Sequence, residues 1–311
     1  MIDATAALLA EVFPGSRISR ADYLEWLYQA SPFGAVVETN LDDEQGRAGH
    51  YAVVPIDLTR DGAPLRGALS LNTAVHERAR GGGTFVALAS ATYEAARARG
   101  IEAVVGVANA ASTPGFLRRL QFELVTPLPT QVLLPVPGRR LGVRSTWASP
   151  AVFGSGGVAD GLETLLSTPA RGLARAWTPE TLRWRLEAPG SRYALHRSAD
   201  ALAVSTADAR HGVAVALILK VFATRPLDAA ARRALVRAVC RTHRAPVALH
   251  VGCNDRAAFA GVPLPERLRE SPLNFIYRAL GTGSPRPERA LDTESPRPEL
   301  TRFEMLDFDA Y

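Results

Sequence analysis

The stretch Asn72-Thr-Ala-Val-His-Glu-Arg-Ala-Arg80-Gly-Gly-Gly-Thr84-Phe-Val-Ala-Leu88 places three consecutive glycines between a β-rich segment and a strong helical pattern. Glycines at such a turn let the main chain come close to a ligand. The N–H groups of the first helical turn point outward and carry a partial positive charge. Together these features favour phosphate binding, so we expect the functional site at this turn.

The segments around the glycine turn predict an antiparallel meander followed by alternating helices and strands. Two helical patterns come first: 3–13 and 19–29. Three β-like runs separated by turn residues follow them: 35–39, 50–58 and 68–75. After the turn, four elements alternate: a helix over 84–99 ended by Gly100, a strand over 101–107 ending at Asn109, a short helix over 113–120, and one or two strands over 122–134.

The second half of the chain repeats this order weakly. Glu180-Thr-Leu-Arg-Trp184 resembles Asp22-Tyr-Leu-Glu-Trp26, and we expect both tryptophans on the core face of a helix. The later elements of this copy are β-like runs over 192–197 and 213–222, a helix over 228–242 and a strand over 247–251. Its strand-to-helix connection has no glycine and loses an N–H at Pro226, so only the first copy is predicted to hold phosphate.

The composition is that of a globular protein with a mild positive charge. Apolar residues make up 47% of the 311 residues and charged residues 22%. The chain has 36 basic and 31 acidic residues, a net charge of +5, and Lys220 is its one lysine. The arginines are scattered without a basic-aromatic element, so we expect no nucleic-acid partner. A positive field favours an anionic substrate or cofactor.

Targeting and redox features predict a cytoplasmic protein. No apolar run reaches the roughly 18 residues of a membrane span. The chain begins Met1-Ile-Asp3, with an acidic residue where a signal peptide would have basic residues, so we expect no signal peptide. Two cysteines, Cys240 and Cys253, fit a reducing compartment better than a disulfide scaffold.

A zinc site is the rival interpretation of the segments Cys240-Arg-Thr-His243 and His250-Val-Gly-Cys253. Residues three apart in a strand point to opposite faces, so His250 and Cys253 are poorly placed to bind one ion. Both cysteines have apolar neighbours, where buried free thiols are common. We therefore expect no metal.

The order of strand, Arg-Gly-x-Gly turn, long helix, strand, Asn and short helix resembles the GNAT superfamily of acyl-coenzyme-A-dependent N-acyltransferases, over roughly Tyr23 to Val125. The family's phosphate turn is Arg/Gln-x-x-Gly-x-Gly/Ala, and two registers fit. Arg78-x-x-Gly81-x-Gly83 satisfies every letter. Arg80-x-x-Gly83-x-Phe85 breaks the last position but places the helix up to Gly100 where the family has it, and we adopt this second register.

The resemblance implies an α+β fold with a mixed, mostly antiparallel sheet flanked by helices, in tandem with a second, degenerate copy. The implied divisions are a GNAT-like catalytic domain over 1–135, a linker over 136–178, a degenerate GNAT-like domain over 179–281 and an extended tail over 282–311 that docks on the body. The tail contains Ser-Pro-Arg-Pro-Glu twice, at Ser284 and Ser295, and we expect Asp307 and Asp309 in solvent rather than at an acceptor site.

The resemblance also implies where acyl-CoA binds. The coenzyme's pyrophosphate would lie on main-chain N–H groups, and the cofactor-binding residues would be Val75, Arg80, Gly81, Gly82, Gly83, Thr84 and Phe85. The strand over 71–75 would pair with the pantetheine arm. Asn109 would lie near the thioester, with a strand-end cap as its alternative role.

The catalytic groups depart from the family pattern. The tyrosine that many members use as general acid is Leu117 here, and no tyrosine lies between Tyr93 and Tyr193. The leaving thiolate must then receive its proton from another group or from water. Of the candidate bases His50, His76 and Glu77, we favour His50, because a histidine titrates near neutral pH and the other two lie near the phosphates. A buried strand histidine with a structural role is the alternative.

These features predict N-acyl transfer from acyl-CoA, acetyl-CoA by default, to a primary amine of a small molecule such as an amino sugar. Long-chain transfer to a lipid-like amine stays open, and so does a non-catalytic module that binds acyl-CoA and a partner. A homodimer also stays open.

Overall fold

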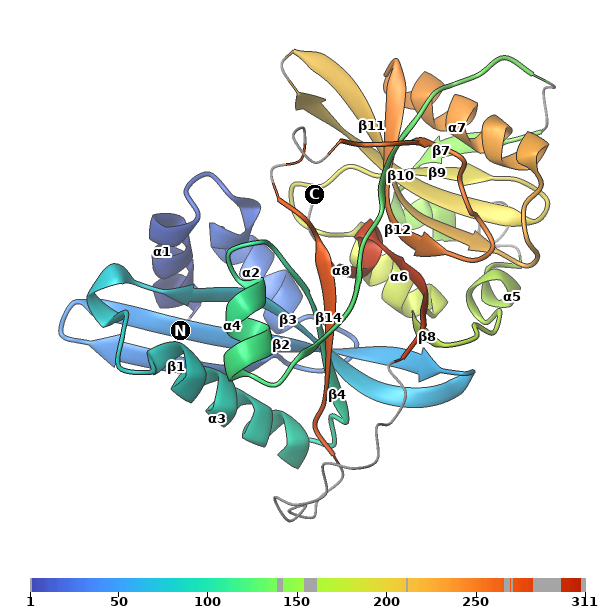
Figure 1. The fold of residues 1–311 in the computed structure, drawn as a ribbon. Helices are drawn as coiled ribbons and strands as arrows, with labels where there is room; N and C mark the ends of the chain where they lie inside the picture. The colour runs from blue at the N-terminus through green and yellow to red at the C-terminus, as the bar shows by residue number, and fades with distance from the viewer. Residues whose placement is uncertain are drawn as a thin grey trace.

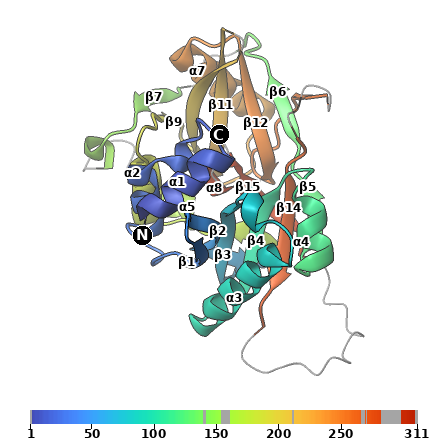
Figure 2. The same ribbon diagram turned by 90° about the vertical axis from the view of Figure 1, so that its left-hand side faces the viewer.

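The computed structural model describes residues 2–138, 142–153, 161–210, 212–265, 269, 271–281 and 298–308. The chain forms two halves, each a sheet flanked by helices, and the two sheets join edge to edge (Figures 1 and 2). No helix within these residues is both long and apolar enough to cross a membrane.

The first half follows the order predicted from the sequence. Its helices and strands are α1 (Ile2–Val12), α2 (Ala21–Tyr28), β1 (Val37–Asp43), β2 (Gly46–Arg60), β3 (Ala63–Val75), α3 (Thr84–Ala98), β4 (Ala103–Ala108), α4 (Thr113–Arg119) and β5 (Glu123–Pro127), with short 3₁₀ turns at Arg17–Ser19 and Glu77–Ala79. The strands β1, β2 and β3 pair antiparallel, and β4 lies parallel to β3. Positive φ angles at Asp61 and Gly62 form the tight turn between β2 and β3.

Alternation along β2 divides the core of the first half into two layers. Ala52, Val54 and Ile56 belong to the core that includes α1 and α2, whereas Tyr51 and Val53 belong to the core of α3 and α4. Successive side chains of a strand point to opposite faces, so both faces of this sheet are covered.

The second half repeats the same order, as predicted. Its elements are β7 (Arg144–Trp147), α5 (Leu162–Leu166), β8 (Leu173–Arg175), α6 (Pro179–Leu186), β9 (Ala194–Arg197), β10 (Ala201–Arg210), β11 (Val213–Ala223), α7 (Ala229–His243), β12 (Val247–Asn254) and β13 (Val262–Pro263), with a 3₁₀ turn at Pro150–Phe153. The strands β9, β10 and β11 pair antiparallel, and β12 lies parallel to β11. The predicted linker over 136–178 therefore contains regular structure, because β7 extends the second sheet through β9.

The two halves exchange a strand. β6 (Thr130–Leu133) leaves the first half and pairs with β12 and β13, while β14 (Asn274–Ala279) returns from the second half and lies between β4 and β5. Figure 1 shows orange β14 among the blue and green elements of the first half. The predicted divisions at 135 and 179 therefore do not separate the two sheets, since each sheet contains a strand from the other half.

The C-terminal segment joins the sheets. β15 (Leu300–Glu304) pairs with β12 and β8, and β8 pairs in turn with β2. The short helix α8 (Met305–Phe308) follows, and all its residues are buried. The part of the predicted tail over 298–308 thus docks on the body, while Ser284, Ser295 and Asp309 lie outside the described residues.

The repeated tryptophans meet at the junction of the halves. The rings of Trp26 on α2 and Trp184 on α6 stack with centroids 4.6 Å apart. The indole nitrogen of Trp26 donates to the main-chain oxygen of Trp184 at 3.1 Å, and the reciprocal bond measures 3.4 Å. Both side chains are buried, as predicted, and their contacts follow the reciprocal pattern of a twofold interface.

Candidate active site

A gap opens between the two parallel strands of the first half. β3 and β4 pair from Gly67 with Ala103 to Ser70 with Gly106, and their pairing ends there. β3 nevertheless continues as a strand to Val75. Its edge beyond Ser70 therefore offers main-chain groups toward the gap, which suits a ligand that binds as an extended chain.

The glycine turn lies at the outer end of this gap. Gly81, Gly82 and Gly83 all have positive φ angles, of 98°, 56° and 84°. Gly83 caps α3, and the first turn of the helix leaves the N–H groups of Phe85 and Val86 without intrahelical acceptors. Left-handed glycines ahead of a helix N-terminus form a concave set of N–H donors that binds anions.

A cavity of about 330 Å³ lies over this turn. It is lined by Val75, Arg80, Gly81, Gly82, Gly83, Thr84, Phe85, Val86 and Arg119. Every residue predicted to bind the cofactor lines this one cavity. Arg119 on α4 was not predicted, because its approach to the turn depends on the packing of α4 against α3. A second guanidinium adds positive charge at a site suited to phosphate.

The two arginines of the turn have different partners. Arg78 lies 2.7 Å from the carboxylate of Asp43, which directs it to β1, whereas Arg80 lines the cavity. This arrangement agrees with the second register. The ring of Phe85 packs against Tyr51 and Phe116, so the bulky side chain at the family's small position is accommodated in the core.

A β-bulge marks the inner end of the gap. His50 pairs with Ala74 and Ala52 pairs with Leu71, so Tyr51 faces two residues of β3, Asn72 and Thr73. Asn72 takes a φ of 53°, which is uncommon outside glycine. The hydroxyl of Thr73 is buried and has no hydrogen-bond partner in the described part of the chain.

A chain of polar side chains meets the bulge. The hydroxyl of Tyr28 lies 2.9 Å from Nε2 of His50 and accepts a hydrogen bond from the amide of Asn72 at 3.1 Å. Nδ1 of His50 lies 2.7 Å from Oδ1 of Asn40 and 3.4 Å from a carboxylate oxygen of Glu38. Four elements, α2, β1, β2 and β3, thus bring their polar side chains to one point.

Burial sets the protonation states of His50 and Tyr28. His50 has no exposed surface, and burial, with a smaller contribution from the positive charge of Arg47, lowers its pKa to about 3. Burial also raises the pKa of Tyr28 above that of a free tyrosine. Both groups are neutral at pH 7. The premise that His50 titrates near neutral pH is therefore wrong, because burial holds its pKa well below that range.

The other predicted residues lie farther out. His76 is beside the glycine turn, where its Nε2 lies 3.1 Å from the carboxylate of Glu11, and Glu77 is exposed in the same 3₁₀ turn. Asn109 accepts a hydrogen bond from the N–H of Ser112 at 2.8 Å, so its side chain closes the turn that follows β4. A role for Asn109 at the thioester stays a prediction.

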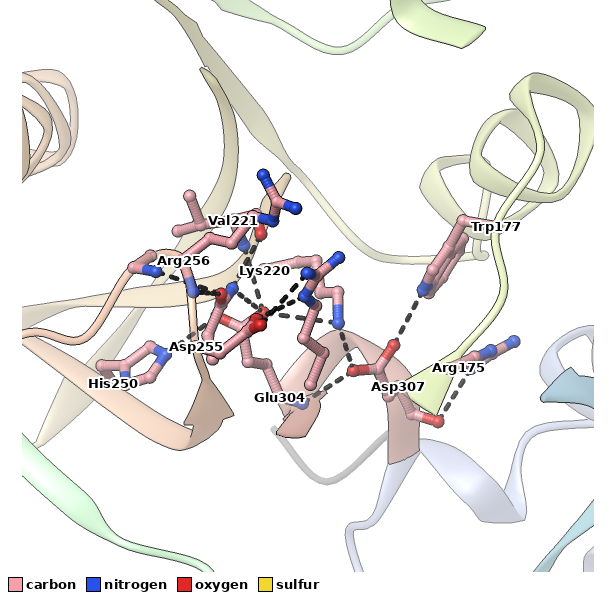
Figure 3. Close-up of polar contacts among 12 residues, drawn as sticks. Arg175, Trp177, Lys220, Val221, His250, Asp255, Arg256, Glu304 and Asp307 are labelled. Atoms are coloured by element: carbon pink, nitrogen blue, oxygen red, sulfur yellow. Dashed lines mark hydrogen bonds and ion pairs between the residues drawn. The ribbon is translucent and has the colours of Figure 1, made fainter. Parts of the chain in front are cut away.

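The second half has the same gap between its parallel strands and the same bulge, but another part of the chain fills the gap. The pairing of β11 with β12 ends at Ile218 and His250, and Leu219 is an extra residue opposite β10. β15 pairs with the free end of β12, and the carboxylate of Glu304 accepts the main-chain N–H of Val221 at 3.4 Å (Figure 3). The chain's own C-terminal strand therefore occupies the place that is open in the first half.

Buried charges hold that strand. Lys220 lies 3.3 Å from Glu304 and 2.7 Å from Asp307, whose carboxylate also accepts from the indole of Trp177 at 2.8 Å (Figure 3). Burial works to raise the pKa of Glu304, but Lys220 and hydrogen bonds from His250 and Asn254 hold it below its usual range. The prediction that Asp307 lies in solvent is wrong, because this ion pair and the apolar side chains of α8 bury it.

The phosphate position of the second half is also closed. Asp228 caps α7, and its carboxylate accepts the N–H of Ala231 at 2.8 Å. A negative side chain thus satisfies the helix N-terminus at the position where the first half presents glycines, and a phosphate there would meet like charge.

The two histidines of the rival zinc site have separate partners, and both cysteines are free thiols. His243 lies 2.7 Å from the hydroxyl of Ser205, and His250 lies 2.9 Å from Glu304. Burial raises the pKa of Cys240 to about 11, which keeps this thiol protonated. Across the described residues, no group of three or more His, Cys, Asp or Glu side chains is arranged to hold a metal.

No protein-family model and no curated protein matches this sequence. Solved structures do match its fold. A GCN5-related N-acetyltransferase from Anabaena variabilis aligns with a TM-score of 0.64 at 12% identity, over 90% of this chain and 70% of that one. Saccharomyces cerevisiae N-myristoyltransferase with bound myristoyl-CoA gives 0.58 at 12% identity, over 89% and 79%.

A tandem arrangement has a solved counterpart as well. A tandem GNAT protein from the clavulanic acid biosynthesis pathway aligns with a TM-score of 0.56 at 14% identity, over 91% of this chain and 94% of that one. The aligned region covers most of both chains, so the likeness spans both halves. The chain therefore has the fold of the GNAT superfamily, built as two GNAT-like copies in tandem.

Proposed function

We propose that the protein is an acyl-CoA-dependent N-acyltransferase and that its first copy carries the reaction. One observation carries this proposal: the cavity at Arg80–Phe85 and the bulge at Asn72–Thr73 lie at the two ends of the same gap between β3 and β4. The coenzyme's diphosphate would bind the glycine turn, and its pantetheine arm would pair with the free edge of β3. The thioester would then lie at the bulge.

The chemistry required there is attack of a neutral amine on the thioester carbonyl. A main-chain N–H near Asn72–Ala74 would meet the developing oxyanion without reorganisation. We assign proton handling to the chain of side chains that contains His50 and propose that Asn109 assists at the thioester. Metal ions have no part in this scheme.

The donor and acceptor are assigned as acetyl-CoA and a primary amine of a small molecule such as an amino sugar. The side chains of Tyr28 and His50 are packed against Asn72 with almost no exposed surface, which favours a short acyl group. A long acyl chain is the second candidate, because the yeast structure of similar fold holds myristoyl-CoA. Free thiols at Cys240 and Cys253 support a cytoplasmic location.

Calorimetry with coenzyme A on a Gly83→Val variant tests this function. Gly83 has a φ of 84° with open space around it, so valine strains the turn and covers the N–H groups. Gly62→Val is the matched control, because Gly62 has a φ of 81° with equally open surroundings but lies in the β2–β3 turn. We expect the coenzyme affinity to fall at least tenfold in Gly83→Val alone.

Unchanged affinity in Gly83→Val would contradict the proposal. Thiol release from acetyl-CoA over a panel of primary amines separates an enzyme from a binding module. An enzyme releases thiol with at least one amine, whereas tight coenzyme binding without thiol release across the panel would favour the non-catalytic module.

A further inference from the structure

Tyr28 is the polar group that lies closest to the bulge from the helical side, and its role was not predicted from the sequence. It is the last residue of α2, and its side chain is 1% exposed. Its hydroxyl lies between the side chain of Asn72 at 3.1 Å and the ring of His50 at 2.9 Å. A buried hydroxyl with two polar partners is held in one position, as proton transfer requires.

The hydrogen bonds of this group have a direction. The amide nitrogen of Asn72 donates, so the oxygen of Tyr28 accepts that bond. Oδ1 of Asn40 accepts, so Nδ1 of His50 carries the hydrogen of the neutral ring. Nε2 of His50 is then the acceptor, and Tyr28 donates its own hydrogen to it. The proton of Tyr28 thus points toward His50, while its oxygen accepts from Asn72 of the bulge.

We propose that Tyr28 is the catalytic acid and base of the acyl transfer, with His50 behind it as a positioning residue and proton store. This inference rests on the proposed function. It also explains the departure at Leu117, because a hydroxyl from α2 takes over the role that the resemblance assigns to a tyrosine of α4.

Tyr28 and His50 together can take up and return every proton that the reaction moves. The amine nitrogen forms a bond to the thioester carbon, and the carbonyl electron pair moves to oxygen. The nitrogen's proton passes to Tyr28 while the proton of Tyr28 passes to Nε2 of His50. When the oxyanion collapses, the carbon–sulfur bond breaks with its pair on sulfur. His50 returns its proton through Tyr28 to sulfur, which gives an amide and a free thiol.

The surroundings of His50 suit a temporary proton store. A carboxylate oxygen of Glu38, buried and without a hydrogen bond among the described residues, lies 3.4 Å from Nδ1 and supplies negative charge while the ring is protonated. Tyr28 is hydrogen-bonded to Asn72 of the bulge, so it is the member of this set that lies next to the place where the proposed function puts the thioester.

Tyr28→Phe removes the hydroxyl and keeps the ring, and its matched control is Tyr23→Phe. Tyr23 lies on the same helix and has no exposed surface. The assay is thiol release from acetyl-CoA with the amine that the wild-type protein uses best, beside calorimetry with coenzyme A. We expect Tyr28→Phe to lower kcat by about 10²–10⁴-fold with coenzyme affinity unchanged, and Tyr23→Phe to leave both unchanged.

Two further readouts separate catalysis from damage to the fold. Incorporation of 3-fluorotyrosine at position 28 keeps the hydroxyl and should retain most of the wild-type kcat. Tyr28→Phe should change the solvent isotope effect on kcat, whereas loss of a purely structural hydroxyl would leave that isotope effect unchanged. A kcat within a factor of about three of wild type in Tyr28→Phe would overturn the proposal. Absence of coenzyme binding in the wild-type protein would instead overturn the proposed function itself, and the calorimetric arm reads that outcome separately.

Discussion

His50 shows how far a single residue can be interpreted from sequence. Its place on a strand beside Tyr51 was predictable, and so was a choice between a base and a structural histidine. Its neighbours were not, because Tyr28 and Asn72 lie 22 residues before and after it and meet it only through tertiary packing. The conformation of the glycine turn was predictable, since its residues are consecutive in the sequence, and phosphate binding there stays a prediction. Arg119 was missed for the same reason as Tyr28.

At this scale we predict that His50→Ala lowers turnover by about 10²–10⁴-fold with coenzyme affinity intact, as expected for loss of general-base assistance. His196→Ala is the matched control, because His196 is also fully buried and hydrogen-bonds to Ser145 and Ser205 in the second copy. Steady-state kinetics and melting curves of both variants provide the test. Equal losses of turnover in both variants, or near-normal turnover in His50→Ala across pH 6 to 9, would show that His50 is only a strand residue.

At the scale of elements, the helices and strands near the glycine turn were predictable, but two pairings were not. The strands β6 and β14 are short, and each finds its partners more than a hundred residues away in the chain. Local propensity and alternation predict a strand without naming its neighbour, so the exchange was invisible in the sequence. The tail is predicted to dock on the body, but Asp307 is predicted to lie in solvent. Its buried partner was not predictable, because Lys220 lies 87 residues before Asp307 and meets it only through tertiary packing.

The docked strand β15 depends on its buried ion pairs. We predict that Lys220→Met lowers the free energy of unfolding by about 3–5 kcal/mol, because Glu304 and Asp307 would lose their buried cation. Arg225→Met is the control, since Arg225 pairs with Asp200 at the surface, where solvent screens the charges and the pair adds little to stability. Denaturant unfolding of both variants gives the comparison. Similar, small losses in both would mean that the buried charges do not hold the C-terminal segment.

At the scale of the whole molecule, the two copies share the order of their elements but differ at the gap between the parallel strands and at the helix N-terminus that follows. Trp26 and Trp184 still pair reciprocally across the junction, and both halves keep the gap and the bulge. The first copy leaves its gap open beside glycines, whereas the second fills it with β15 and caps α7 with Asp228. We therefore propose one coenzyme site per chain, in the first copy.

Buried neutral histidines predict how the stability of the whole molecule depends on pH. Burial lowers the pKa of both His50 and His196 to about 3, whereas an unfolded histidine titrates near 6.5. Below pH 6.5 the unfolded chain binds protons that the folded chain does not, so stability is full above 6.5 and falls as the pH is lowered toward 3. Each histidine contributes about 1.4 kcal/mol per pH unit, or roughly 4 kcal/mol for the pair at pH 5. Urea unfolding at pH 7.5 and 5 measures this, and a pH-independent free energy of unfolding would refute it.

The central claim is that one acyl-CoA binds in the first copy, between the glycine turn and the bulge. A crystal structure of the protein with acetyl-CoA tests it most directly. We predict one coenzyme per chain, with its diphosphate on the N–H groups of residues 81–86, its arm along β3 and its thioester within hydrogen-bonding distance of Asn72–Ala74 and Tyr28. A coenzyme bound at 224–228 in the second copy, or one in the first copy whose thioester lies away from the bulge, would contradict the account.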